Sequence, residues 1–250
     1  MYKVVKRPAA WYNTRHSTKD GMRMFSGFSK KTGGFLWELA FNNERPWFLA
    51  HKQEFEDFVN TPFKTLASES FALFTGRCPD FSGSVHVSRI YRDARRLFGR
   101  GPYKDHLWFS VTDSAVVHNG PMLWFEISPA QYSYGMGWYG ATPAQMEAFR
   151  RSIDANPARF RRLAQALERK GWLLGGESYK RPKALHDDAL IDSWYNRKYA
   201  GVHKEFDLGG DAYTAALPGI VADAFQELLP MYRYLMEVYL SCPEEMKRER

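Results

Sequence analysis

LWFEISPAQYSYGMGWY, residues 123–139, contains two short runs in which apolar and polar residues alternate on either side of a Ser-Pro pair. Alternation with a period of two is typical of a β-strand with one buried face, and the Ser-Pro pair indicates a turn between two strands. Two similar runs come earlier in the chain, VHVSRIY at residues 85–91 and LWFSV at residues 107–111. Short strands joined by turn residues predict an antiparallel β-meander.

Helical patterns flank these strands on both sides. We expect one helix after the Gly33–Gly34 pair, with its apolar face made of Phe35, Leu36, Leu39 and Ala40. The stretch Thr142–Gln145 matches a capping box with proline in the first turn, which predicts the start of another helix. A last helix is predicted from near Pro218, and Pro230 is expected to kink or divide it.

The fold class that follows is α+β, an antiparallel β-meander sheet packed with N-terminal and C-terminal helices. We expect residues 25–250 to form a single α+β domain and residues 1–24 to form a basic, irregular extension. The chain has a formal net charge of +7, but residues 1–31 contain eight bases and one acid. The positive charge therefore belongs to the N-terminal segment and does not describe a basic domain face.

The remaining composition indicates a cytoplasmic protein. Two cysteines in 250 residues argue against a disulfide framework and for a reducing compartment. No apolar run approaches the ~18 residues of a membrane span, and the first thirty residues lack the apolar core of a signal peptide. Forty aromatic residues are many for this length. We interpret them mainly as core residues, and as the lining of a cleft only in second place.

The sequence predicts neither a cofactor nor a metal. Residues 135–140 match the pattern G-x-G-x-x-G, but the strands before it look antiparallel and Trp138 and Tyr139 are bulky where a phosphate would approach. We therefore favour close packing at these glycines over dinucleotide binding. His186–Asp187–Asp188 is interpreted as a solvated turn, because neighbouring side chains on an extended chain point apart.

Positive charge gathers within the chain at RIYRDARRLFGRGPYK, residues 89–104, which holds six cationic side chains and one acid. Asp93 adjoins Arg92 and can reach Arg95, so it could hold a guanidinium fork in place. Fixed guanidinium groups with donors to spare suit a phosphate or a carboxylate. The alternative is a salt-bridge network that only braces the loop between two strands.

This stretch resembles the motif RxxRDxRFxxx[DN]KxxY of a sparsely distributed bacterial family, the domain of unknown function 2461. The matching residues are Arg89, Arg92, Asp93, Arg95 and Tyr103, followed by Lys104. Further similarity, from residue 25 to about residue 200, includes the stretch NNERPWF at residues 42–48. The chain departs from the motif at Arg96, Gly99 and Arg100, and at Gly99 the family has an acid or an amide. The resemblance implies a location for a site but no reaction.

From the resemblance we predict that residues 42–48, at a helix junction, lie near the arginine segment and complete a polar pocket with an aromatic wall. The predicted ligand-binding residues are Arg89, Arg92, Asp93, Arg95, Tyr103, Lys104, Asn42, Asn43, Arg45 and Trp47.

The leading hypothesis is a cytosolic protein that binds a small anionic ligand. An aspartate tied to two arginines should have a lowered pKa and be a poor base, which favours binding over catalysis. One alternative is nucleic-acid binding through the basic N-terminal segment and loop 95–104, with exposed aromatics such as Trp11 and Trp138. Another is a structural or partner-binding module in which the arginines brace the fold.

Overall fold

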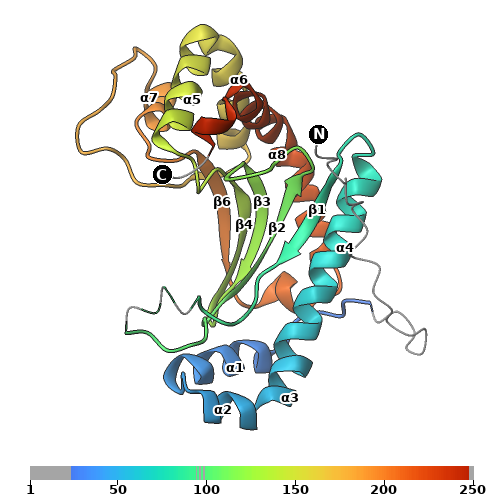
Figure 1. The fold of residues 1–250 in the computed structure, drawn as a ribbon. Helices are drawn as coiled ribbons and strands as arrows, with labels where there is room; N and C mark the ends of the chain where they lie inside the picture. The colour runs from blue at the N-terminus through green and yellow to red at the C-terminus, as the bar shows by residue number, and fades with distance from the viewer. Residues whose placement is uncertain (1–23, 94, 96, 98, 248–250) are drawn as a thin grey trace, which may run out of the picture.

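The computed structural model describes residues 24–247 except residues 94, 96 and 98. Within these residues the strands form one six-stranded antiparallel sheet in the order β1-β2-β3-β4-β6-β5 (Figure 1). Their bounds are β1 Gly83–Val87, β2 Leu107–Asp113, β3 Met122–Ile127, β4 Gln131–Gly137, β5 Leu173–Leu174 and β6 Gly201–Asp207. Strands β1 to β4 follow one another as neighbours, so the predicted meander and the α+β class are confirmed.

Helices surround three sides of this sheet. Figure 1 shows α4 and α8 on one face, α1–α3 beyond one end of the strands, and α5–α7 beyond the other end. The helices before the sheet are α1 Lys30–Phe41, α2 Arg45–Ala50, α3 Lys52–Phe55, the π-helix η1 Glu56–Asn60 and α4 Thr61–Arg77. Those after β4 are α5 Pro143–Ala155, α6 Pro157–Arg169, α7 Ala189–Tyr195, the 3₁₀-helix η3 Gly210–Tyr213, α8 Leu217–Ser241 and the 3₁₀-helix η4 Glu244–Met246.

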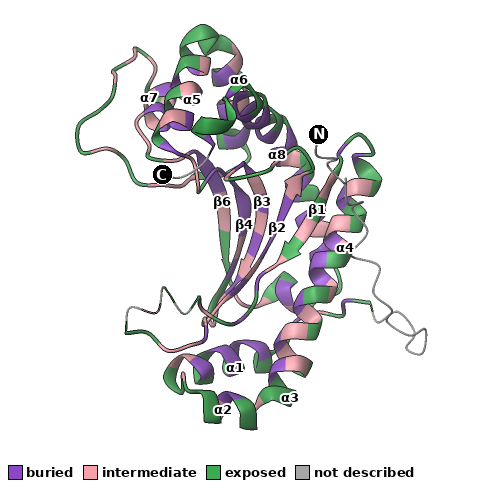
Figure 2. Cartoon of the chain, in the orientation of Figure 1, coloured by how far each residue is buried: buried purple, intermediate pink, exposed green. Residues whose placement is uncertain are grey.

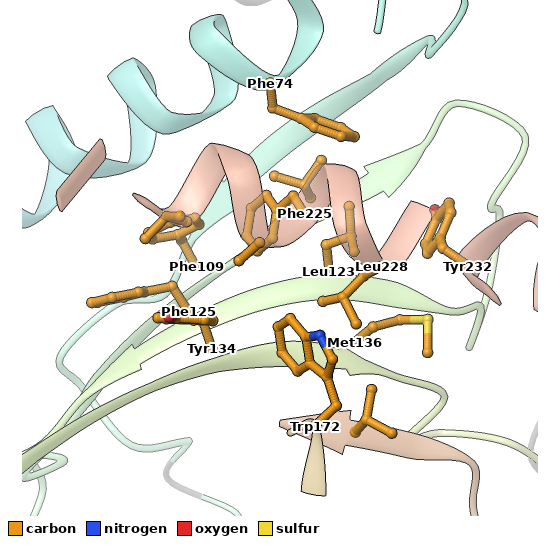
Figure 3. Close-up of a cluster of buried hydrophobic side chains, with 14 of the residues drawn as sticks. Phe74, Phe109, Leu123, Phe125, Tyr134, Met136, Trp172, Phe225, Leu228 and Tyr232 are labelled. Atoms are coloured by element: carbon orange, nitrogen blue, oxygen red, sulfur yellow. The ribbon is translucent and has the colours of Figure 1, made fainter. Parts of the chain in front are cut away.

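The hydrophobic core lies between the sheet and helices α4 and α8 (Figure 3). In β3 every second residue is buried, whereas the neighbouring strands β2 and β4 each contain a run of consecutive buried residues (Figure 2). Phe109 and Phe125 are opposite each other in register and stack at a centroid distance of 5.4 Å. Phe225 of α8 and Phe63 of α4 meet Phe109 edge-on. The apolar half of the alternating pattern therefore faces these two helices.

One expectation about helices is wrong and another is wrong in part. The Gly33–Gly34 pair does not precede α1 but lies inside it, where Gly33 packs so closely that an added Cβ would lie 2.8 Å from the carbonyl oxygen of Pro129. Pro230 does not divide α8, which runs as one helix from residue 217 to residue 241, and a kink at this residue stays a prediction. Buried residues lie on both sides of Pro230, and their packing outweighs a proline cost of about 3 kcal/mol.

Another local signal is confirmed, since Thr142 and Gln145 form the predicted capping box at the start of α5. Strand β6 and helix α7 were not predicted. In β6 three of the seven residues of GVHKEFD are exposed, and its charged residues hide the strand pattern.

The predicted N-terminal extension, residues 1–24, lies outside the described residues except for its last residue, and a single domain over residues 25–250 stays a prediction. No helix among the described residues is long and apolar enough to cross a membrane.

Candidate ligand-binding site on the open face of the sheet

The junction between α1 and α2 is tied to the arginine segment by the side chain of Asn43. Its amide nitrogen donates to the carbonyl oxygen of Tyr103 at 2.9 Å, and its amide oxygen accepts from the Tyr103 backbone N–H, also at 2.9 Å. Gly101 lies so close to Asn43 that a Cβ at this position would overlap the amide group. The Asn43 side chain therefore pairs with both backbone groups of Tyr103, as a residue of a neighbouring β-strand would.

Arg92 reinforces the same point. Its Nε donates to the Tyr103 carbonyl oxygen at 2.7 Å, and its terminal nitrogen lies 3.6 Å from the Asp105 carboxylate. The Arg92 backbone N–H also donates to the carbonyl oxygen of Pro102. We call Asn43, Arg92 and the backbone of Tyr103 the loop clamp. Two of the three guanidinium nitrogens of Arg92 thus face acceptors within the protein.

The phenol ring of Tyr103 packs into the hydrophobic core. It is 2% exposed and stacks on Phe48 of α2 at a centroid distance of 4.2 Å. Burial raises the pKa of its hydroxyl above the ordinary value. Tyr103 therefore serves packing rather than contact with a solvent-borne ligand.

The other predicted residues differ in their surroundings. Asp93 accepts two hydrogen bonds from the guanidinium of Arg95, whose side chain is 89% exposed, so this pair lies in solvent. Arg45 lies close enough to lower the pKa of Tyr103, against the raising effect of burial. The remaining positions make contacts outside the clamp: Asn42 donates to the carbonyl oxygen of Glu38 in α1, Trp47 stacks on His51, and Arg89 lines a separate pocket described below.

Lys104 is the predicted residue that reaches the open face of the sheet, the face opposite α4 and α8. Its backbone N–H donates to the carbonyl of Ile90, and its Nζ lies 5.7 Å from the centroid of the Trp108 ring. Adjacent residues of an extended chain point to opposite sides. The Tyr103 ring therefore faces the core while the Lys104 ammonium faces the open side.

Cross-strand register defines what lies on that face. Trp108 of β2 is opposite Glu126 of β3, and Trp124 of β3 is opposite Gly135 of β4. These positions alternate with the core residues, which places both tryptophans and the glutamate on the open side. Figure 1 shows the loop after β1 and the loop after β5 projecting to one side of the sheet, beyond its two ends.

A pocket of about 440 Å³ lies on this face, and we call it the open-face pocket. It is lined by Trp108, Met122, Trp124, Glu126 and Tyr139. The rings rest on glycines: a Cβ on Gly135 would lie 3.0 Å from the Trp124 ring, and one on Gly137 would lie 2.6 Å from the Tyr139 ring. The glycine pattern of residues 135–140 therefore makes room for aromatic rings.

Charged groups gather at one end of the open-face pocket. Desolvation lowers the pKa of Lys104, and the Arg92 charge lowers it further. Desolvation raises the pKa of Glu126, with Asp105 and Glu205 adding to the rise, while His106 and Lys104 oppose it. A partly desolvated ammonium and carboxyl at the edge of an aromatic floor can bind a ring that carries a charged group.

An Asp–His pair completes this end. His106 Nδ1 lies 2.9 Å from Asp105 Oδ1, and the same carboxylate faces Arg92. Burial alone would raise the pKa of Asp105, but the hydrogen bond with His106 and the nearby charges lower it overall. This contact orients the imidazole.

The arginine segment lies beside one end of the open-face pocket, but sequence reasoning singled out none of the residues that line this pocket as ligand-binding residues. Trp108, Trp124 and Glu126 all carry a usable signal, because each occupies the polar half of an alternating run whose other half is core. A tryptophan on that half of a strand places a large ring on the face of the sheet opposite the core, where it can line a pocket. By contrast, Trp138, expected to be exposed, is fully buried and donates to the carbonyl of Asn119.

Comparison with known protein families finds one whose model matches most of the chain. The model of a family described as conserved hypothetical protein, the domain of unknown function 2461, matches residues 31–234. The match covers the clamp, the arginine segment and all strands of the sheet. No curated protein matches the chain.

Proposed function

Since the chain belongs to the DUF2461 family of conserved hypothetical proteins, a description that names no activity, we propose a function from the geometry: binding of a small ligand that combines a ring with a phosphate or carboxylate group. The ring stacks on Trp108 and Trp124 in the open-face pocket. The anionic group binds Lys104, with His106 as a second donor. This proposal keeps the predicted anionic ligand but moves it from the arginine segment to the sheet beside it.

One observation supports this proposal above others: the Lys104 ammonium stands beside the Trp108 ring at the rim of the open-face pocket. A second observation concerns the aromatic lining. The buried Trp124 indole N–H lies close enough to the Tyr139 hydroxyl to lower that group's pKa against the effect of burial, so the two side chains support each other at the pocket.

The test uses three probes that separate the ring from the charge: phenyl phosphate, inorganic phosphate and phenol. Titration of the full chain with each, followed by tryptophan fluorescence and calorimetry, gives three affinities. We expect phenyl phosphate to bind more tightly than either fragment, because it alone engages the rings and Lys104 together. If phenyl phosphate binds no better than phosphate or phenol, or none binds at concentrations up to about 10 mM, the proposal is wrong.

Two substitutions with matched controls locate the binding. Lys104→Met should weaken phenyl phosphate by about tenfold or more through loss of a charge-assisted contact. Trp108→Leu should weaken it by roughly three- to tenfold through loss of ring stacking. The controls Lys180→Met and Trp37→Leu alter exposed residues of the same types elsewhere and should leave affinity unchanged.

Single-stranded nucleic acid is a second candidate ligand, favoured by two tryptophans on an open sheet face next to an arginine-rich loop. Salt separates the two candidates. Several phosphate contacts would make affinity fall steeply with salt, whereas one anionic group held by Lys104 should respond weakly. A labelled oligothymidylate measured at low and high salt provides this comparison. A cytoplasmic location fits either ligand and is part of the proposal.

A further inference from the structure

Strand β1 forms one edge of the sheet, and its outer side is unpaired. In an antiparallel ladder every second residue directs its N–H and C=O away from the paired neighbour. No described residue forms a backbone hydrogen bond with Gly83–Val87 from that outer side. The strand's sequence, GSVHV, contains no proline, lysine or acid. It therefore lacks the proline and charged residues that commonly prevent an exposed edge from pairing with another strand.

A second pocket, of about 320 Å³, opens at the end of this edge, between β1 and the helices α3 to α4. Its floor is apolar and includes the buried rings of Phe48 and Phe55 together with Ile90. Its lining residues are Phe48, Lys52, Phe55, Glu56, Asn60, Lys64, Val87, Ser88, Arg89, Ile90 and Tyr91. A strand edge beside a helix, with a pocket at its end, is a geometry that receives extended peptides.

The charges at this edge pocket are unbalanced. Lys52, Lys64 and Arg89 are exposed at its rim, and within the described part of the chain none of them forms an ion pair with an acid. The acid in the lining, Glu56, accepts a hydrogen bond from Asn60 at 2.6 Å. Three cations against one acid favour an anionic occupant over a neutral or basic one.

We propose that β1 and the edge pocket bind an extended acidic peptide. The peptide backbone adds a strand to the outer side of β1, and one apolar side chain enters the pocket. Its carboxylates, from acidic side chains or from a free C-terminus, bind Lys52, Lys64 and Arg89. This site is separate from the open-face pocket and does not depend on the ligand proposed for it.

Peptide display tests the charge preference. Random peptides are selected against the full chain, and the enriched sequences are synthesised with a fluorescent label for polarisation measurements. We expect enrichment of sequences that alternate polar and apolar residues and carry acids, and a loss of affinity of about tenfold or more in the double variant Lys52→Glu/Lys64→Glu. The control Lys180→Glu/Arg181→Glu makes the same change in net charge at exposed positions outside the pocket and should bind normally.

Hydrogen exchange tests the strand addition without a variant. Bound peptide should slow exchange of amides in Gly83–Val87, whose outward groups gain partners, and leave those of β5, at the other edge, unchanged. The proposal is wrong if the selected peptides are neutral or basic, or if the variant Lys52→Glu/Lys64→Glu binds them as well as the unchanged chain does. It is also wrong if bound peptide protects amides elsewhere but not those of β1.

A second copy of the chain is the other possible occupant of this edge, and sedimentation without peptide tests for it. A dimer that peptide cannot dissociate would assign the edge to a second copy instead.

Discussion

The loop clamp makes a sharp prediction, because Asn43 has an adjacent residue of the same type as its control. Asn43→Ala removes both hydrogen bonds to the Tyr103 backbone. The Tyr103 carbonyl oxygen keeps its bond from Arg92, but the Tyr103 N–H loses its acceptor. Asn42→Ala removes one exposed bond to the carbonyl of Glu38.

The magnitude follows from these contacts. A hydrogen bond contributes about 1 kcal/mol net, and a half-buried donor left without a partner costs about 1–3 kcal/mol. Asn43→Ala should therefore lower the free energy of unfolding by about 2–3 kcal/mol. For a chain of this length that corresponds to a fall in melting temperature of roughly 4–12 °C. Asn42→Ala should cost about 0.5 kcal/mol or less.

Two measurements check this. Guanidinium denaturation of both variants gives the difference in stability, and hydrogen exchange of the Tyr103 amide reports the contact itself. Exchange at Tyr103 should accelerate in Asn43→Ala and remain unchanged in Asn42→Ala. Equal stability of the two variants, or an unaltered Tyr103 amide in Asn43→Ala, would refute the clamp.

Three further outcomes are expected. Glu126→Gln should stabilise the protein near neutral pH. The pKa of Glu126 is raised in the folded protein, so its ionised form opposes folding at any pH above the pKa of the unfolded state. Thermal melts should show that the gain in stability vanishes in acid. His186, bonded to Asp192 at 2.7 Å, has a pKa raised above 6.5 by that bond, so its contribution should be complete below pH 6.5 and disappear as pH rises through the folded-state pKa. Melts of His186→Asn across this range should lack that loss. Arg150 is 3% exposed and donates to the carbonyl of Tyr195, so Arg150→Ala should cost about 3 kcal/mol in denaturant unfolding, and Arg150→Lys should recover little of it.

Most of the sheet could be predicted because its information is local. The alternating runs at residues 107–111 and 123–128 indicate which residues face the core. Because the core residues of neighbouring strands must lie on the same face, this alternation restricts the register in which the strands pair. Strand β6 could not be predicted in this way, since Lys204 lies on the core side with its ammonium 4.6 Å from the centroid of the Trp172 ring. A long stem can cover an aromatic ring while its charge stays near solvent, and this breaks the binary pattern.

The candidate site was harder to predict because its contacts join distant segments. The family motif drew attention to Arg92 and Tyr103, but the sequence does not say that the Tyr103 backbone would use the donors of Asn43 and Arg92. The predicted contact between Asp93 and Arg95 is present, but the sequence does not say that Arg95 would lie exposed. A high density of charged residues identifies a segment of the sequence. Which of its side-chain donors remain free for a ligand depends on the backbone groups that pack against that segment in the fold.

The clamp and the open-face pocket are linked through one peptide unit. Tyr103 is held by Asn43 and Arg92 and buried against Phe48, and the next residue, Lys104, extends to the Trp108 ring on the opposite side. A shift of the Tyr103 backbone must therefore move the Lys104 ammonium, although Asn43 does not line the pocket. Asn43→Ala should then weaken phenyl phosphate while leaving phenol unaffected, since phenol depends on the rings alone. Equal weakening of both probes would mean that the clamp supports the whole sheet rather than the position of Lys104.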